Sequence, residues 1–220
     1  IRDAEVSRGL GDVYKRQIQA SELQNKGVLA NCHVNVLQTQ DHPQFKTYGE
    51  ELKWLTTDPT RMTWVAKTIQ DIATSGNTLI LVDRISAGEI LEKKIKDAVF
   101  VSGSTKNTDR KEQYDEVSTS QNKIIIATYG VAAVGINIPR IFNLVLIEPG
   151  KSFIRVIQSI GRGIRKAEDK DSVQIWDITS SCKFAKRHLG ARKKFYKEAN
   201  YPYNIETVSY THLRAHETPL

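Results

Sequence analysis

The stretch NTLILVD (77–83) decides the fold class, because it is a continuous apolar run bounded by turn-forming residues. Such a run predicts a strand that is buried on both faces of a sheet. Similar short apolar segments, AVFVSG, KIIIATY, NLVLIEP and SVQIWDIT, follow it along the chain. They predict further strands at 98–103, 123–129, 143–149 and 172–179.

Segments with helical periodicity separate these strands. They predict helices at 61–76, 85–97, 107–120, 151–166 and 182–200. Alternation of buried strands and helices indicates an α/β fold with a doubly wound, mostly parallel sheet. Ligands of such sheets gather outside the carboxyl ends of the strands. The loops after Asp83, Gly103, Tyr129 and Pro149 are therefore the first places to search for a site.

The two ends of the chain differ in character from the middle. Residues 1–17 and 209–220 contain RGLGDVYKRQ and SYTHLRAHETPL, which resemble translated adapter or vector sequence. We expect non-native tails there, with genuine disordered tails as the alternative. Residues 18–56 are expected to be the end of a preceding domain and a linker, since 41–60 is polar and contains prolines. The α/β domain is expected at 57–208.

Composition limits the possible functions. The 220 residues carry a net charge of +7, which favours an anionic partner such as nucleic acid. Two cysteines are too few for a disulfide framework or a cysteine-rich zinc site, and no metal ligands are assigned. Neither a secretory signal nor a membrane-length apolar run is visible. We expect a cytoplasmic protein, in a bacterial host if the chain comes from a phage.

The segment SFIRVIQSIGRGIR (152–165) carries the most chemical information. At helical spacing its apolar residues form one face, and Gln158, Arg162 and Arg165 cluster on the opposite face. Arginine presents a rigid fork of donors that suits phosphate, and it can neutralise charge on a transferring phosphoryl group. The alternative is a solvated basic face of an amphipathic helix. The neighbouring glycines and the Q-x-x-G-R-x-x-R spacing favour a functional role.

QSIGRGIR resembles motif VI of superfamily 2 helicases. The resemblance implies that Arg165 is an arginine finger and that Arg162 also reaches the nucleotide phosphates. It further implies that Gln158 couples the nucleotide to the domain interface.

IIIATYGVAAVGINIP (124–139) resembles motif V of the same family. By that resemblance, Thr128 and Gly130 would hold the nucleic-acid backbone, and Gly135 and Asn137 would face the nucleotide ribose. Asn137 stands where many relatives have aspartate, and one extra residue separates the threonine from the V-A-A run. The alternative is an ordinary glycine-rich turn.

TLILVDRISAGEIL (78–91) and VFVSGSTKNTDRKE (99–112) resemble motif IV and the segment after it. The loop that contains Ser102, Gly103, Ser104 and Lys106 offers small donors and a lysine at a strand end, which could cradle a backbone phosphate. An ordinary polar turn is the alternative.

Together these motifs resemble the C-terminal, second RecA-like domain of superfamily 2 helicases, in particular phage recombination helicases of the UvsW type. The resemblance implies a P-loop NTPase-like motor domain that acts on DNA or an RNA–DNA hybrid. ATP and Mg²⁺ would be held mainly by an N-terminal RecA-like domain of the same protein, so this chain alone is expected to be inactive. The alternative is a non-catalytic nucleic-acid or protein-binding module.

The last predicted helix is strongly basic and could line a nucleic-acid path, although a solvated surface helix is an equal alternative. Its cations are Lys183, Lys186, Arg187, Arg192, Lys193, Lys194 and Lys197.

Overall fold

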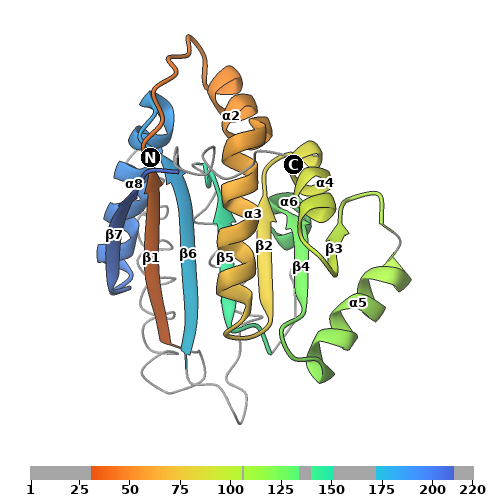
Figure 1. Ribbon diagram of the computed structural model, residues 1–220. Coiled ribbons are helices and arrows are strands. Elements are labelled where there is room, and N and C mark those ends of the chain that lie inside the picture. Colours follow the sequence, from red (N-terminus) through yellow and green to blue (C-terminus); the bar gives the residue numbers. More distant parts are fainter. Residues whose placement is uncertain (1–30, 106, 134–139, 151–171, 211–220) are drawn as a thin grey trace, which may run out of the picture.

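The computed structural model describes residues 31–105, 107–133, 140–150 and 172–210. In this part of the chain, seven strands form one parallel sheet with the order β3-β4-β2-β5-β6-β1-β7 (Figure 1). The strands are β1 Asn31–Thr39, β2 Thr78–Val82, β3 Ala98–Val101, β4 Ile124–Thr128, β5 Asn143–Ile147, β6 Ser172–Ser180 and β7 Tyr203–Val208. The prediction of a doubly wound, mostly parallel sheet is confirmed.

Alternate residues of the central strands face two separate hydrophobic cores. In β2, Leu79 and Leu81 belong to one core, whereas Ile80 and Val82 belong to the other, and all four are buried. Successive side chains of a strand point to opposite faces, so an entirely apolar strand needs cover on both sides. This explains why the run at 77–83 carries no polar alternation.

Helices provide that cover on both faces. The helices α3 (Pro59–Ala73) and α4 (Ile85–Lys94) pack on one face, and α5 (Asn107–Thr119), α6 (Tyr129–Ala133) and α8 (Lys183–Glu198) contribute to the core on the other. Figure 1 shows α3 and α4 in front of the sheet and α8 behind it, beside β7 and β1. The predicted helix at 151–166 lies outside the described residues.

The helix α2 (Tyr48–Thr57) was not expected, because residues 41–60 predict a connector. It begins with a capping box: the Thr47 hydroxyl accepts the Glu50 N–H at 3.3 Å, and the Glu50 carboxylate accepts the Thr47 N–H at 3.1 Å. Two reciprocal bonds satisfy amides that a helix start otherwise leaves open. Leu55 then packs on Cys182 and Ala185, which holds α2 against the start of α8.

The strand β1 differs from the expectation that 18–56 belongs to a preceding domain and a linker. It lies inside the sheet, with β6 on one side and β7 on the other, and its register pairs Asn31 with Ser172 and Thr39 with Ser180. Val34 and Val36 are completely buried in the core. Residues from Asn31 onward therefore belong to the same sheet as the predicted α/β domain.

Tyr210 belongs to the predicted tail at 209–220, yet it is buried against the domain. Its hydroxyl donates to Asp41, and its ring stacks on Trp64 with 5.8 Å between the centroids. Residues 1–17 and 211–220 of the predicted tails lie outside the described residues.

Candidate nucleic-acid and nucleotide interface

The predicted backbone-binding residues come together at the carboxyl edge of two neighbouring strands. β3 and β4 pair in parallel, with Val101 opposite Ala127 as their last partners. Ser102 and Thr128 are the next residues along each strand, so they extend side by side from the sheet at the ordinary strand spacing of about 4.8 Å. The structure thus places the two loops that the sequence singles out next to each other.

The loop after β3 is folded on itself by short-range bonds. The Ser102 N–H donates to the Thr105 hydroxyl at 3.0 Å, and the Thr105 N–H donates to the Ser102 carbonyl at 3.2 Å. The Ser102 and Ser104 hydroxyls are 2.7 Å apart. A Cβ built on the exposed Gly103 meets nothing within 4 Å. The loop is therefore preformed and open above its glycine, which suits the close approach of a backbone phosphate.

Thr128 closes β4 and starts the short helix α6. Its hydroxyl accepts the Val131 N–H at 3.4 Å, which is a long bond at a helix start. The next residue, Tyr129, is buried and donates its hydroxyl to the Ile147 carbonyl of β5 at 3.3 Å. Burial raises the pKa of this phenol well above its usual value, so it stays a neutral donor. Tyr129 fixes the turn, while Gly130 remains exposed to solvent.

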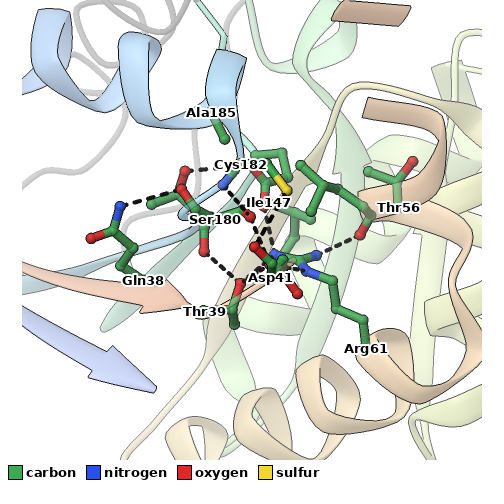
Figure 2. A network of polar contacts seen from close by, with 12 residues as sticks. Gln38, Thr39, Asp41, Thr56, Arg61, Ile147, Ser180, Cys182 and Ala185 are labelled. Atoms are coloured by element: carbon green, nitrogen blue, oxygen red, sulfur yellow. Dashed lines mark hydrogen bonds and ion pairs between the residues drawn. The ribbon is translucent and has the colours of Figure 1, made fainter. Parts of the chain in front are cut away.

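A buried ionic network lies behind the carboxyl ends of β1, β5 and β6. Arg61 of α3 is fully buried and donates to the Glu148 carboxylate at 2.5 Å. Its Nε lies 3.6 Å from Asp41 Oδ2, which also accepts the Thr39 and Ser180 hydroxyls at 2.6 Å each. Figure 2 shows Thr39, Arg61 and Ser180 converging on Asp41 from different elements.

Glu148 of that network directly follows β5 and is buried. Burial raises its pKa to about 7, although the Arg61 and Arg192 guanidinium groups act in the opposite direction. Its φ of 44° is in the left-handed region, which costs roughly 1–2 kcal/mol for a residue with a Cβ. The bonds from Arg61 and from the Thr179 hydroxyl, at 3.3 Å, hold it in this conformation.

A second buried arginine reaches the same turn from the other face of the sheet. Arg192 of α8 forms two bonds with Asp177 of β6, at 2.8 and 3.0 Å, and donates a third to the Pro149 carbonyl at 2.5 Å. The Tyr196 hydroxyl completes the set by donating to Asp177 at 2.8 Å. The turn at 148–149 is thus held by one arginine from each helical layer. Gly150 alone separates this turn from Lys151, where the predicted arginine-bearing helix begins.

Sequence reasoning missed this pair of anchors. Arg192 was counted among the exposed cations of the basic helix, but the structure corrects this, because the residue is only 2% exposed and fully bonded. The sequence around Arg61 predicts a helix but not its buried ion pair with Glu148. A charged residue in an amphipathic segment is normally solvated, and nothing local shows that a carboxylate far along the chain will meet it. The apolar residues that flank Arg192 in the sequence, at helical spacing, were the only available signal.

The predicted nucleotide-binding and catalytic residues lie outside the described part of the chain, as does one lysine of the β3 loop. They are Gln158, Arg162, Arg165, Gly135, Asn137 and Lys106. Their roles remain predictions.

The described residues hold no group of three or more His, Cys, Asp and Glu side chains that could bind a metal ion. Cys32 and Cys182 are not joined by a disulfide, and Cys182 is buried. Within the same described ranges, no helix is both long and apolar enough to span a bilayer.

Comparison with known proteins identifies the domain. Residues 61–167 match the family model of the helicase conserved C-terminal domain. The chain is 28% identical over 202 residues to the ATP-dependent DNA helicase uvsW of Enterobacteria phage T4, an alignment that covers 87% of the chain. It is 32% identical over 104 residues, 46% of the chain, to a putative helicase of Sulfolobus islandicus filamentous virus.

The crystal structure of T4 UvsW has the same fold, with a TM-score of 0.70 over 81% of this chain at 24% identity. The matched region is 42% of that structure. The chain spans 40% of the length of the T4 relative and 18% of the viral one. Residues 61–167 therefore match the helicase conserved C-terminal domain, and the chain is similar to the corresponding part of a UvsW-like superfamily 2 helicase, with the same RecA-like fold.

Proposed function

We propose that this chain is the C-terminal motor domain of an ATP-dependent helicase or translocase that acts on DNA. The observation that carries the proposal is the match of residues 61–167 to the helicase C-terminal domain, together with the adjacent positions of Ser102 and Thr128 at one sheet edge. Ligands of parallel sheets bind at that edge. A domain of this kind works against a partner domain that binds the nucleotide.

On the nucleotide side, Arg162 and Arg165 act as arginine fingers toward ATP held by an N-terminal RecA-like domain of the same protein. Gln158 couples the nucleotide to the interface, and Gly135 and Asn137 face the ribose. ATP supplies the phosphoryl group whose transfer releases energy, and Mg²⁺ accompanies it on the N-terminal domain. The proposal is supported by the Q-x-x-G-R-x-x-R pattern and by the doubly anchored turn that precedes it.

On the nucleic-acid side, the backbone is gripped by Thr128 and Gly130 and by the loop of Ser102, Gly103, Ser104 and Lys106. The support is the open space above Gly103 and the preformed turn that holds the serine hydroxyls. Phosphate contacts of this type position a strand without reading its sequence. The same contacts would serve DNA or an RNA–DNA hybrid.

The arginine finger is tested in the full-length protein that carries this domain. Arg165→Ala should lower the ATP turnover number by about 10³–10⁵, the range attributed to arginine fingers, while DNA affinity is retained. Lys93→Ala, which removes one exposed cation from α4, is the matched control and should leave turnover unchanged. An Arg165→Ala protein with normal turnover would refute the finger. A full-length protein that binds DNA but never hydrolyses ATP would favour the non-catalytic module.

A further inference from the structure

The helix α8 presents a continuous row of cations to solvent. The row follows helical spacing along one side, while the opposite side, which includes Leu189, Phe195 and Tyr196, is buried in the core. Side chains at intervals of three and four residues lie above one another on the surface of a helix. We call the row the basic stripe; its exposed members are Lys183, Lys186, Arg187, Lys194 and Lys197.

Lys183 and Arg187 of the basic stripe lie over the Phe184 ring, with their charged groups 5.4 and 5.7 Å from its centroid, but these contacts leave the positive charge uncompensated. None of its five members forms an ion pair with a carboxylate among the described residues. Glu198 is the single acidic residue of α8 and stands at its end. The stripe covers 14 helical steps, or about 21 Å, which equals roughly six nucleotides of one duplex strand. An extended polyanion matches this geometry better than an isolated phosphate does.

Gly190 lies in the middle of the basic stripe and has no structural reason among the described residues. It is exposed, and a Cβ built on it meets nothing within 4 Å. Glycine is unfavourable inside a helix. By contrast, a Cβ on Gly88 of α4 would come within 2.3 Å of the Phe100 ring, so packing explains that glycine. Gly190 instead leaves room for a ligand to reach the helix backbone between the cations.

The N-terminal amides of α8 are not the anion site, because Glu51 already occupies them. Its buried carboxylate accepts the Phe184 N–H at 3.1 Å and the Ala185 N–H at 2.7 Å. An external anion must therefore bind along the side of α8. That side starts at the carboxyl edge of the sheet, since α8 follows β6 directly.

We propose that the basic stripe and Gly190 form a second nucleic-acid contact, which holds the phosphates of one DNA strand along α8. It lies outside residues 61–167, which match the helicase family. It begins at the carboxyl edge of the sheet, where the Ser102 and Thr128 loops also lie, and it adds further cations to the single Lys106 of those loops. The inference rests on the proposed function only in requiring that the chain binds DNA. Each phosphate contact releases bound counterions, so the stripe makes binding strongly dependent on salt.

The test measures binding of the 220-residue chain to fluorescein-labelled single-stranded and duplex DNA by anisotropy, across a range of NaCl concentrations. The variant combines Lys186→Gln, Arg187→Gln and Lys194→Gln. The slope of log affinity against log salt should fall in magnitude by roughly 2–3, because each lost contact contributes about 0.7–0.9. The matched control replaces the exposed Lys93, Lys94 and Lys96 by Gln, which removes the same charge and should leave the slope unchanged.

Substitutions at Gly190 distinguish an effect on DNA binding from an effect on stability. Both Gly190→Ala and Gly190→Leu should raise the melting temperature by about 2–4 °C, because they replace glycine in an open helix position. Gly190→Leu should nevertheless weaken DNA binding, since its side chain fills the gap. A leucine variant with raised stability and unchanged affinity overturns the role of Gly190.

The outcomes distinguish this inference from the proposed function. If Thr128→Val weakens DNA binding while the stripe variant does not, the stripe inference fails and the motor proposal stands. If the chain binds no DNA at low salt, both fail. If polyglutamate competes as well as DNA at equal charge, the stripe is a site for acidic protein and the inference is overturned. The inference is supported if the slope of log affinity against log salt falls in the stripe variant and not in the control variant.

Discussion

Replacing Glu148 by glutamine should change how the stability of the domain depends on pH. Burial raises the pKa of Glu148 from its ordinary 4.5 to about 7, so the folded chain favours the protonated carboxyl. Below pH 4.5 the carboxyl is protonated in both the folded and unfolded states, and it carries no penalty. As the pH rises through 7 the group ionises in the folded state as well, and the penalty becomes complete.

The size of the effect follows from that difference in pKa. At 1.36 kcal/mol per pH unit, the gap between 4.5 and about 7 corresponds to about 3 kcal/mol. Glutamine keeps an oxygen that can accept the Arg61 bond but cannot ionise. The Glu148→Gln chain should therefore gain about 3 kcal/mol relative to the parent between pH 4.5 and pH 8.

Urea denaturation followed by tryptophan fluorescence, at constant ionic strength, measures this difference at each pH. Glu116→Gln is the control, because Glu116 is 52% exposed in its ion pair with Lys123 and should give a difference that stays within about 1 kcal/mol. If the relative stability of Glu148→Gln instead falls as pH rises, the ion pair with Arg61 outweighs burial and our reasoning is wrong. A difference in stability between the two chains that does not change with pH also contradicts our reasoning.

Three further substitutions test the packing around the site by the same urea assay. Arg192→Met should destabilise the fold by about 3–5 kcal/mol because it leaves Asp177 buried and unpaired, and adding Asp177→Leu should restore most of that loss; no recovery in the double variant contradicts this. Gly88→Ala should cost roughly 1–3 kcal/mol through its clash with the Phe100 ring, although alanine is the better helix former, and a stabilised variant would exclude the clash. Tyr129→Phe should cost about 0.5–1.5 kcal/mol by leaving a strand carbonyl without its donor, and an unchanged midpoint would show that the bond is unimportant.

The central strands were predictable from the sequence because their signal is local. An uninterrupted apolar run such as 77–83 can only be covered on both faces, and the observed β2 agrees to within one residue at each end. The strand β5 begins at the predicted Asn143 but ends at Ile147, two residues before the predicted end. Alternation with helices then determines a parallel sheet.

What escaped prediction depends on distant partners. The pairing of β1 with β6 joins residues about 140 positions apart, which no local pattern encodes. The ion pair between Arg61 and Glu148 could not be predicted for the same reason, because the two residues are 87 positions apart. The T-x-x-E spacing of Thr47 and Glu50 is a local helix-start signal, but the prediction for 41–60 rests on its polar, proline-containing composition alone. The adjacency of Ser102 and Thr128 followed only from strand order.

The position of β1 inside the sheet has a consequence for synthesis on the ribosome. β1 ends at Thr39 and its partner β6 begins at Ser172, so about 130 residues must be translated between them. At about 5–20 residues per second, β1 waits roughly 7 to 26 seconds with both edges open. Open edges invite pairing with strands of other nascent chains. Slower translation would lengthen this interval, so soluble yield should depend on chaperones that shield β1 until β6 emerges.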